Sequence, residues 1–313
     1  MQVMVDLGLI VLLSVVLLKA TDVMVVGVNR LVYDTHWNAF GITAILVGLL
    51  TSFPELWVGI SAAIEGDPVL SLGNVLGSNI ANVSLVMGGA AILGGGVGVV
   101  GEFLKRDFFT AFLAGALPLL LFLDGVISRV DGVVLLLVYV IYVMVTLQFR
   151  ASRRLLRKVG WVEKEKDVVW ILVGAVVLIF AADQLVRAAV RLSGELGVAP
   201  FLVGLFLVAV GTSLPELSFE IEAIRKKEVG MVYGNLLGSI VANSSLILGV
   251  TALIVPIRLS ERDVESYLVA TVAFVLVFGV FWWLVRTKKR LDRWEGGVLV
   301  LIYGLFALWE WLR

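Results

Sequence analysis

Long apolar stretches, separated by short polar segments, run through the whole sequence. A membrane-spanning helix needs about 20 apolar residues, and ten stretches meet or approach that length, five in each half of the chain. The predicted helices cover residues 3–31, 38–64, 69–98, 108–124, 130–148, 167–192, 198–224, 230–255, 264–285 and 294–312. The pattern predicts an all-α polytopic membrane protein with ten transmembrane helices.

The two halves repeat one another. The segment T-S-F-P-E at Thr51–Glu55 returns as T-S-L-P-E at Thr212–Glu216, an offset of 216 − 55 = 161 residues. The same offset relates Gly73–Asn82 to Gly234–Asn243 without a gap, and further on the offset becomes 164. A register kept over such a length indicates a duplicated membrane unit.

The predicted number of crossings also fixes how the repeats are related. Five crossings per half make the second half enter the membrane from the opposite side, so the two five-helix repeats are predicted to be inverted. The predicted domains are a first five-helix repeat at 1–149, a basic cytoplasmic linker at 150–166 and a second, inverted repeat at 167–313.

Lys and Arg are distributed unevenly over the predicted loops. Eighteen lie on one side: Arg30, Lys105, Arg106, Arg150, Arg153, Arg154, Arg157, Lys158, Lys164, Lys166, Arg225, Lys226, Lys227, Arg286, Lys288, Lys289, Arg290 and Arg293. Six lie on the other: Arg129, Arg187, Arg191, Arg258, Arg262 and Arg313. Cytoplasmic loops carry the excess, so both termini are predicted to be extracellular and the protein integral to the cell membrane, with the linker resting on anionic lipid.

Composition excludes several classes of function. Hydrophobic residues make up 60% of the chain and charged ones 16%, whereas soluble domains carry about 25% charge. The chain has no cysteine and one histidine, His36, interpreted as a loop residue, which excludes disulfides, thiol catalysis and His/Cys metal clusters. With only Glu as a base beside Ser52 or Ser213, no enzymatic activity is expected. Nothing in the sequence indicates a nucleic acid or an obligate protein partner.

A charge inside an apolar stretch costs about 2.5–3.5 kcal/mol even on the insertion scale, and two of the acidic residues inside these stretches carry the most weight. These are Glu55 and Glu216, each directly after a proline, Pro54 or Pro215, that should break or kink its helix. A single such Glu could be a protonated packing residue. Two at equivalent places in inverted repeats should meet near the symmetry axis and repel, unless a cation lies between them.

The same segments supply further oxygen atoms. Thr51, Ser52, Thr212 and Ser213 offer hydroxyls, and the carbonyls of Gly48, Thr51, Ala209 and Thr212 are expected to lose their helical partners at the proline breaks. Carboxylate, hydroxyl and carbonyl oxygens suit calcium or sodium better than zinc, copper or iron, and magnesium demands stricter octahedral geometry.

Each repeat contains a second polar piece. Ser78 and Asn82 are four residues apart, as are Ser239 and Asn243, so each pair shares one helix face. Glycines four apart in the same pieces have the spacing of close helix packing. Packing is one interpretation of this pattern, and close approach would also bring the Ser and Asn oxygens up to the Glu of a neighbouring helix.

These motifs closely resemble the α-repeats of the calcium/cation antiporter superfamily, in particular the prokaryotic sodium/calcium exchangers. The resemblance covers the ten-helix layout and implies electrogenic exchange of sodium for calcium. It implies a central calcium site made by Glu55, Glu216 and the carbonyls of Thr51 and Thr212. The flanking sodium sites would use Ser52, Ser213, Ser78, Ser239 and the carbonyls of Gly48 and Ala209, with Asn82 and Asn243 closing the middle.

The chain departs from that family pattern at several positions. Asn243 stands where several relatives carry Asp, and Leu50 and Phe53 replace the usual Gly and Leu. Glu220 has no acidic counterpart, because its repeat mate is Gly59. It is either a carboxylate on an access pathway or a protonated packing residue.

The predicted function is secondary antiport of sodium against calcium by alternating access, with the ions competing for one site. The helices at 3–31 and 167–192 are expected to slide over a rigid core, as the resemblance implies. No cofactor is expected beyond the transported calcium and sodium ions. A calcium/proton antiporter of the same fold is the alternative, and a cation channel or an intramembrane hydrolase is less favoured.

Overall fold

The computed structural model describes residues 2–33, 45, 47–99, 108–150 and 164–312. Within these ranges eight helical segments are long and apolar enough to cross a membrane: Gln2–Gly27, Pro68–Gly94, Arg129–Thr146, Val168–Leu196, Pro200–Arg225, Val229–Ile254, Asp263–Lys288 and Arg293–Leu312. Phe108–Asp124 is a shorter apolar helix. A polytopic helical membrane protein is therefore confirmed. The start of the predicted 38–64 span, His36 and linker residues 151–163 lie outside the described residues.

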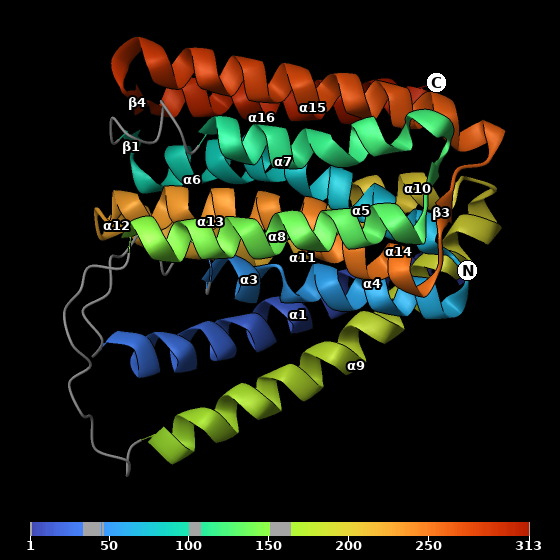
Figure 1. The fold of residues 1–313 in the computed structure, drawn as a ribbon, viewed down its shortest axis with the longest axis horizontal. Coiled ribbons are helices and arrows are strands. Elements are labelled where there is room, and N and C mark those ends of the chain that lie inside the picture. The colour runs from blue at the N-terminus through green and yellow to red at the C-terminus, as the bar shows by residue number, and fades with distance from the viewer. Residues whose placement is uncertain (1, 34–44, 46, 100–107, 151–163, 313) are drawn as a thin grey trace.

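Two long helices, α1 (Gln2–Tyr33) and α9 (Lys164–Leu196), run together along one edge of the molecule. The opposite edge is formed by α15 (Glu261–Lys288) and α16 (Arg293–Leu312) (Figure 1). A small residue lets α1 and α9 meet closely, because a Cβ added at Gly174 would lie 2.7 Å from Met24 Cγ. The two helices share a buried apolar cluster that includes Leu17, Ala181 and Leu185.

Each half contains a broken helix in the middle of the molecule. In the first half α3 (Gly48–Thr51) ends at Ser52 and α4 (Phe53–Glu65) begins directly after it. In the second half α10 (Pro200–Leu202), a π-helical segment η5 (Val203–Val208) and α11 (Ala209–Thr212) end at Ser213, and α12 (Leu214–Arg225) follows.

The two breaks have the same backbone conformation. Ser52 has φ −83° and ψ 7°, and Ser213 has φ −84° and ψ 3°. Pro54 and Pro215 occupy the first turn of the following helix, where a missing N–H removes no hydrogen bond. The predicted interruption is thus confirmed, and it falls on the serine two residues before each proline.

The second polar piece of each half lies on a helix that widens into a π-helical turn. In the first half it spans α5 (Pro68–Ala81), η2 (Asn82–Val86) and α6 (Met87–Gly94). In the second half it spans α13 (Val229–Val241), η6 (Ala242–Ile247) and α14 (Leu248–Ile254). Such turns often mark functional sites.

Glycines on these helices allow close contact between the halves. A Cβ at Gly77 would collide with the carbonyl of Leu205, and a Cβ at Gly48 would lie 2.9 Å from Gly238 Cα. Packing is therefore one role of these glycines, as expected. The contact also brings α5 and α13 against the broken helices that carry the two glutamates.

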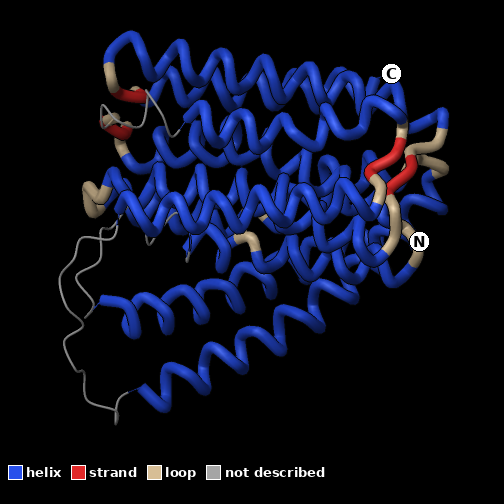
Figure 2. The backbone as a smooth tube through the Cα atoms, in the orientation of Figure 1, coloured by secondary structure: helices blue, strands red, loops and turns tan. Residues whose placement is uncertain are grey.

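Two short antiparallel ladders join loops of the first half to loops of the second. β1 (Val97–Gly98) pairs with β4 (Arg290–Leu291), and β2 (Val126–Ile127) pairs with β3 (Ile257–Arg258). The two ladders lie at opposite ends of the helices (Figure 2). The helices that flank β2 are α7 (Phe108–Leu121) with the 3-10 turn η4 (Phe122–Asp124), and α8 (Arg129–Arg150).

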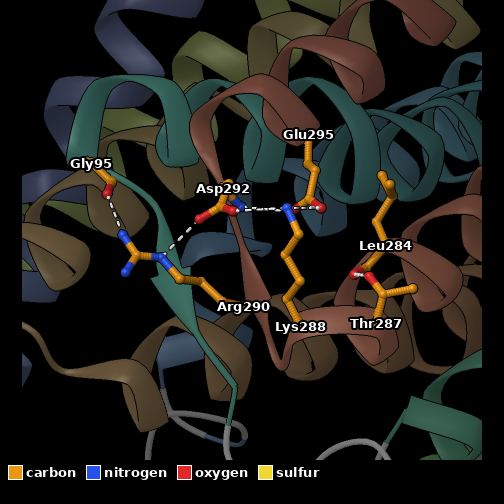
Figure 3. A network of polar contacts seen from close by, with 7 residues as sticks. All are labelled: Gly95, Leu284, Thr287, Lys288, Arg290, Asp292 and Glu295. Carbon is orange, nitrogen blue, oxygen red and sulfur yellow. Dashed lines mark hydrogen bonds and ion pairs between the residues drawn. The ribbon is translucent and has the colours of Figure 1, made fainter.

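An ion-pair network closes the turn between α15 and α16 at the β1–β4 end (Figure 3). Arg290 Nε lies 3.0 Å from Asp292 Oδ1, and its guanidinium also donates to the carbonyl of Gly95 at 3.2 Å. Lys288 Nζ lies 3.4 Å from Asp292 Oδ2 and 3.7 Å from the buried Glu295 carboxylate. These contacts tie the end of α6 to the α15–α16 turn.

Candidate cation-binding site

The two intramembrane glutamates occupy equivalent places in the broken helices. Glu55 lies in the first turn of α4 and Glu216 in the first turn of α12, and both side chains are fully buried. The N-terminus of a helix carries partial positive charge, which favours a carboxylate there. The two carboxylates lie within electrostatic range of each other, as the repeat predicted.

The site is built at the junction of the two halves. Ser78 Oγ donates to Glu55 Oε1 at 3.4 Å, and the Glu55 carboxylate also lies beside Thr212 and Ser213 of the other half. In the same way Glu216 lies beside the Thr51 hydroxyl of the first half. Each carboxylate is therefore surrounded by groups from both repeats.

A symmetric pair of hydrogen bonds holds the two breaks in register. Thr51 Oγ1 donates to Asn235 Oδ1 at 3.0 Å, and Thr212 Oγ1 donates to Asn74 Oδ1 at 3.2 Å. All four side chains are fully buried. Asn74 and Asn235 were not among the predicted site residues. Both lie in the repeated motif at the 161-residue offset, and this repeat is the signal that could have identified them.

The predicted release of backbone carbonyls is wrong for Gly48 and Ala209. The carbonyl of Gly48 accepts from the backbone N–H of Ser52 at 3.2 Å, and that of Ala209 accepts from Ser213 at 3.0 Å. The helical ladder persists up to each serine, because the break comes after this bond. A carbonyl oxygen has a second lone pair, and at Gly48 the Ser239 hydroxyl donates to the same oxygen at 3.3 Å.

Unsatisfied buried polar atoms concentrate at this junction. They include Ser52 Oγ, Ser213 Oγ, Glu55 Oε2, both carboxylate oxygens of Glu216, both side-chain polar atoms of Asn82, and Asn243 Oδ1. Native proteins leave few such atoms, and each costs roughly 1–3 kcal/mol. A set of this kind fits a site whose oxygens are completed by bound cations.

The two asparagines of the predicted site are not equivalent. Asn243 Nδ2 donates to Asn79 Oδ1 at 3.2 Å, and Asn79 Nδ2 donates to Ser244 Oγ at 2.6 Å. These two hydrogen bonds fix the Asn243 amide, whereas Asn82 has no hydrogen-bond partner. The repeat mate of Asn79 is Ile240, so the repeat symmetry gave no signal for Asn79 and it was not predicted as a site residue.

All twelve predicted site residues are buried in this region: Gly48, Thr51, Ser52, Glu55, Ser78, Asn82, Ala209, Thr212, Ser213, Glu216, Ser239 and Asn243. Contacts described above join most of them, and Asn82 and Asn243 lie one helical turn beyond Ser78 and Ser239. In the part of the chain that the structure describes, no three His, Cys, Asp or Glu side chains form a metal cluster. The donors are mixed oxygens, which suit hard cations.

The family model described as "Sodium/calcium exchanger protein" matches residues 5–148 and 166–312, which are the two halves that carry the broken helices. The chain belongs to the sodium/calcium exchanger family. It is therefore a membrane transporter and not an enzyme, and the ions at such a site are transported cargo rather than cofactors.

Several known proteins resemble the chain over nearly its whole length. It is 29% identical to the inner membrane protein YrbG of Escherichia coli, covering 94% of this chain and 96% of that protein. It is 27% identical to the sodium/calcium exchanger MaX1 of Methanosarcina acetivorans, covering 96% and 97%. A solved structure of the sodium-calcium exchanger NCX_Mj, soaked with Na⁺, superimposes with a TM-score of 0.69 at 26% identity, covering 97% of this chain and 98% of that one.

Proposed function

We propose that the chain is a secondary antiporter that exchanges sodium for calcium by alternating access. The observation that carries the proposal is the pair Glu55 and Glu216, fully buried, close together and lacking hydrogen bonds at three of their four carboxylate oxygens. The predicted twelve-residue oxygen set would hold the ions. The family membership supports cation exchange in general. The choice of sodium and calcium as the two exchanged ions is the proposal.

Competition for one site follows from the charges. Two carboxylates need two positive charges, which one calcium ion supplies and which sodium supplies only with several ions. Calcium and the sodium ions therefore neutralise the same groups and exclude one another. An empty site would leave two buried, unpaired charges, so crossing of the empty carrier is costly. This cost couples the two ion movements, because the loaded states are the ones that change conformation.

The helix pair α1 and α9 is the proposed moving part. It lies at one edge of the molecule (Figure 1) and packs on the core through an apolar cluster that also includes Val58, Leu70 and Val208. Arg191 Nη2 pairs with the buried Asp6 carboxylate at 2.8 Å, which would keep α9 and α1 together as they slide. The site residues are shut off from solvent on both sides, which fits an occluded step of the transport cycle.

Two inverted five-helix repeats are the proposed topology, with domains 1–149 and 167–313 joined by the 150–166 linker. Repeat-equivalent contacts support it. A Cβ at Gly88 would lie 2.6 Å from the carbonyl of Gly296, and a Cβ at their mates would make the matching contact, 3.0 Å from Gly249 to the carbonyl of Gly132. The offsets also exchange the β1–β4 ladder with β3–β2, and these ladders lie at opposite ends (Figure 2).

Both termini are proposed to face the outside of the cell membrane. In Figure 1 both ends of the chain lie at the same end of the molecule, opposite the β1–β4 ladder. That ladder and the ends of α12 and α15 carry the basic residues Arg225, Lys226, Lys288 and Arg290, which favour the cytoplasmic side.

Exchange of calcium for protons is the second candidate. It is favoured by one observation, since no salt bridge joins Glu55 or Glu216 to a basic side chain in the described part of the chain, and each carboxylate could carry a proton instead. The test is calcium-45 uptake into liposomes containing the purified protein, with sodium, potassium and pH gradients imposed one at a time. Uptake driven by the outward sodium gradient alone is expected. Uptake driven by the pH gradient alone would favour the proton antiporter.

A further inference from the structure

A buried pair of polar side chains, Asn79 and Ser244, joins the two halves. Asn79 lies near the end of α5, and Ser244 lies in the π-helical turn η6. Asn79 Nδ2 donates to Ser244 Oγ at 2.6 Å, and neither residue is more than 1% exposed. Neither side chain is among the predicted ion ligands, so the pair calls for another explanation.

The repeat replaces both members of this pair by apolar residues. At the 161-residue offset, Asn79 corresponds to Ile240 and Ser244 corresponds to Val83. Ile240 and Val83 are fully buried and belong to one apolar cluster. Replacing both partners of a buried hydrogen bond by apolar groups of similar shape costs little stability. Packing alone therefore does not require a polar pair at Asn79 and Ser244.

Asn79 makes a second hydrogen bond, and this bond reaches a predicted ion ligand. Asn243 Nδ2 donates to Asn79 Oδ1 at 3.2 Å. Ser244 thus holds the Asn79 amide, and Asn79 holds the Asn243 amide. The oxygen and the nitrogen of an amide lie on different branches of one planar group, so Asn243 Oδ1 is directed away from Asn79. That oxygen is buried and has no hydrogen bond.

The helix that carries Asn243 contacts the break of the first half. Ser239 lies one turn before Asn243, and its hydroxyl lies 3.2 Å from Thr51 Oγ1 and donates to the carbonyl of Gly48 at 3.3 Å. A cation in this region can use the oxygen of an asparagine side chain but not its N–H groups. The hydrogen bond to Asn79 occupies the nitrogen and leaves the oxygen available.

The first half lacks this restraint. The repeat mate of Asn243 is Asn82, and the residue equivalent to Asn79 is Ile240, whose side chain cannot accept a hydrogen bond. Both polar atoms of the Asn82 amide have no partner. The repeat therefore explains why one asparagine of the predicted site is fixed and the other is not.

We propose that Asn79 is a positioning residue, which holds the Asn243 amide so that its oxygen is presented to the ions. Asn243 is then a preset cation ligand, whereas the Asn82 amide turns to suit the ion that is present. Groups that orient a metal ligand commonly contribute on the order of 10-fold to affinity. The inference rests on the proposed function in one respect, because it takes cations as the occupants of the Glu55–Glu216 site.

The test gives the Asn79–Ser244 contact the apolar side chains of its repeat mate, in the double variant Asn79→Ile/Ser244→Val. Purified protein in detergent is titrated with CaCl₂ or with NaCl, and N-methyl-D-glucamine chloride keeps the ionic strength constant. A ligand that binds only the folded state raises the melting temperature according to its concentration relative to its dissociation constant. We expect the apparent dissociation constant for calcium, sodium or both to rise on the order of 10-fold. If the double variant does not fold, Asn79→Ala replaces it, since this change removes both hydrogen bonds and adds no bulk.

Two further variants separate positioning from packing. Asn79→Asp keeps an acceptor for Asn243 Nδ2 and for the Ser244 hydroxyl, so we expect it to bind cations at least as tightly as wild type. If Asn79 served packing alone, the apolar double variant would bind like wild type and the buried Asp would weaken binding. In an Asn243→Ala background the double variant is expected to have no further effect, because Asn79 acts through Asn243.

Ser71→Ala/Thr251→Ala is the matched control. These two buried hydroxyls are also hydrogen-bonded between the halves, at 3.0 Å, and their repeat mates, Val232 and Ala90, are apolar. No printed contact links them to the ion ligands in the described part of the chain, so the control is expected to keep wild-type cation affinities even if it unfolds at a lower temperature.

The outcomes separate this inference from the proposed function. A wild-type protein whose melting temperature responds to neither calcium nor sodium would contradict both. A cation response in wild type that stays unchanged in the Asn79→Ile/Ser244→Val variant would overturn the positioning role alone. The same holds for binding by Asn79→Asp as weak as that of the double variant, or for an undiminished effect of the double variant in the Asn243→Ala background.

Discussion

Thr51 of the first half donates a hydrogen bond of 3.0 Å to Asn235 of the second, and the repeat reproduces this bond between Thr212 and Asn74 at 3.2 Å. The two bonds cross the boundary between the halves in opposite directions. Each fixes the residue that directly precedes a helix break. The geometry of the candidate site therefore depends on both repeats at once, and neither half holds it alone.

Removing either threonine hydroxyl should loosen the site without unfolding the protein. Thr51→Val keeps the side-chain shape and removes the hydrogen bond to Asn235. We therefore expect the apparent sodium affinity in exchange assays to fall by roughly 3- to 10-fold, which corresponds to the free energy of about one hydrogen bond. Thr212→Val should have a similar effect because of the repeat. Thr287→Val, whose hydroxyl donates to Leu284 O on α15, is the control. An unchanged sodium dependence in both site variants would show that these hydroxyls do not contribute to sodium binding.

A negative charge at position 243 should change how sodium is used. Asn243 donates to Asn79 Oδ1 at 3.2 Å, and an ionised Asp cannot donate. Asn243→Asp therefore loses that bond and adds a negative charge at a predicted ion ligand. We expect altered sodium cooperativity or cation preference with little change in expression, measured as calcium uptake against sodium concentration. Superimposable curves for the variant and wild type would place Asn243 outside the ion site.

Close packing between the halves predicts a sharp difference between two glycines. A methyl group at Gly77 would collide with the carbonyl of Leu205, whereas nothing lies within 4 Å of a Cβ at Gly279. Overpacking costs about 1–3 kcal/mol, so Gly77→Ala should lower the melting temperature in detergent. Gly279→Ala should leave it unchanged or raise it slightly, since Ala favours a helix by about 1 kcal/mol over Gly. Equal melting temperatures for the two variants would contradict the described contact.

The sequence predicted two kinds of feature: those that recur at the same offset in both repeats, and charged groups that are costly to place in hydrocarbon. Glu55 and Glu216 could be found because a carboxylate inside a spanning helix is rare, and finding it twice at one offset is rarer. The helix breaks could be predicted from Pro54 and Pro215. The position of each break could not be predicted from the prolines. The hydrogen bonds to the Gly48 and Ala209 carbonyls show that the helical backbone hydrogen bonds continue to the serine before they end.

Contacts that depend on how the halves fit together were out of reach of sequence reasoning. The bonds from Asn243 to Asn79 and from Asn79 to Ser244 join α5 to η6, and Asn79 has an apolar repeat mate. The ladders formed by Val97–Gly98 and Val126–Ile127 are two residues long, too short for an alternating pattern to appear. Both features need the three-dimensional register of one half against the other.

The most direct test of the central claim is sodium-driven calcium-45 uptake by the Glu55→Gln variant in liposomes, beside wild type and Glu195→Gln, whose side chain is exposed on α9. Gln keeps the size of the side chain and removes the charge that calcium and sodium are proposed to share. We expect calcium uptake by Glu55→Gln to fall to the level of protein-free liposomes, although the purified variant elutes as folded protein. Glu195→Gln is expected to transport like wild type. Wild-type uptake by Glu55→Gln would contradict a shared site between the two buried carboxylates.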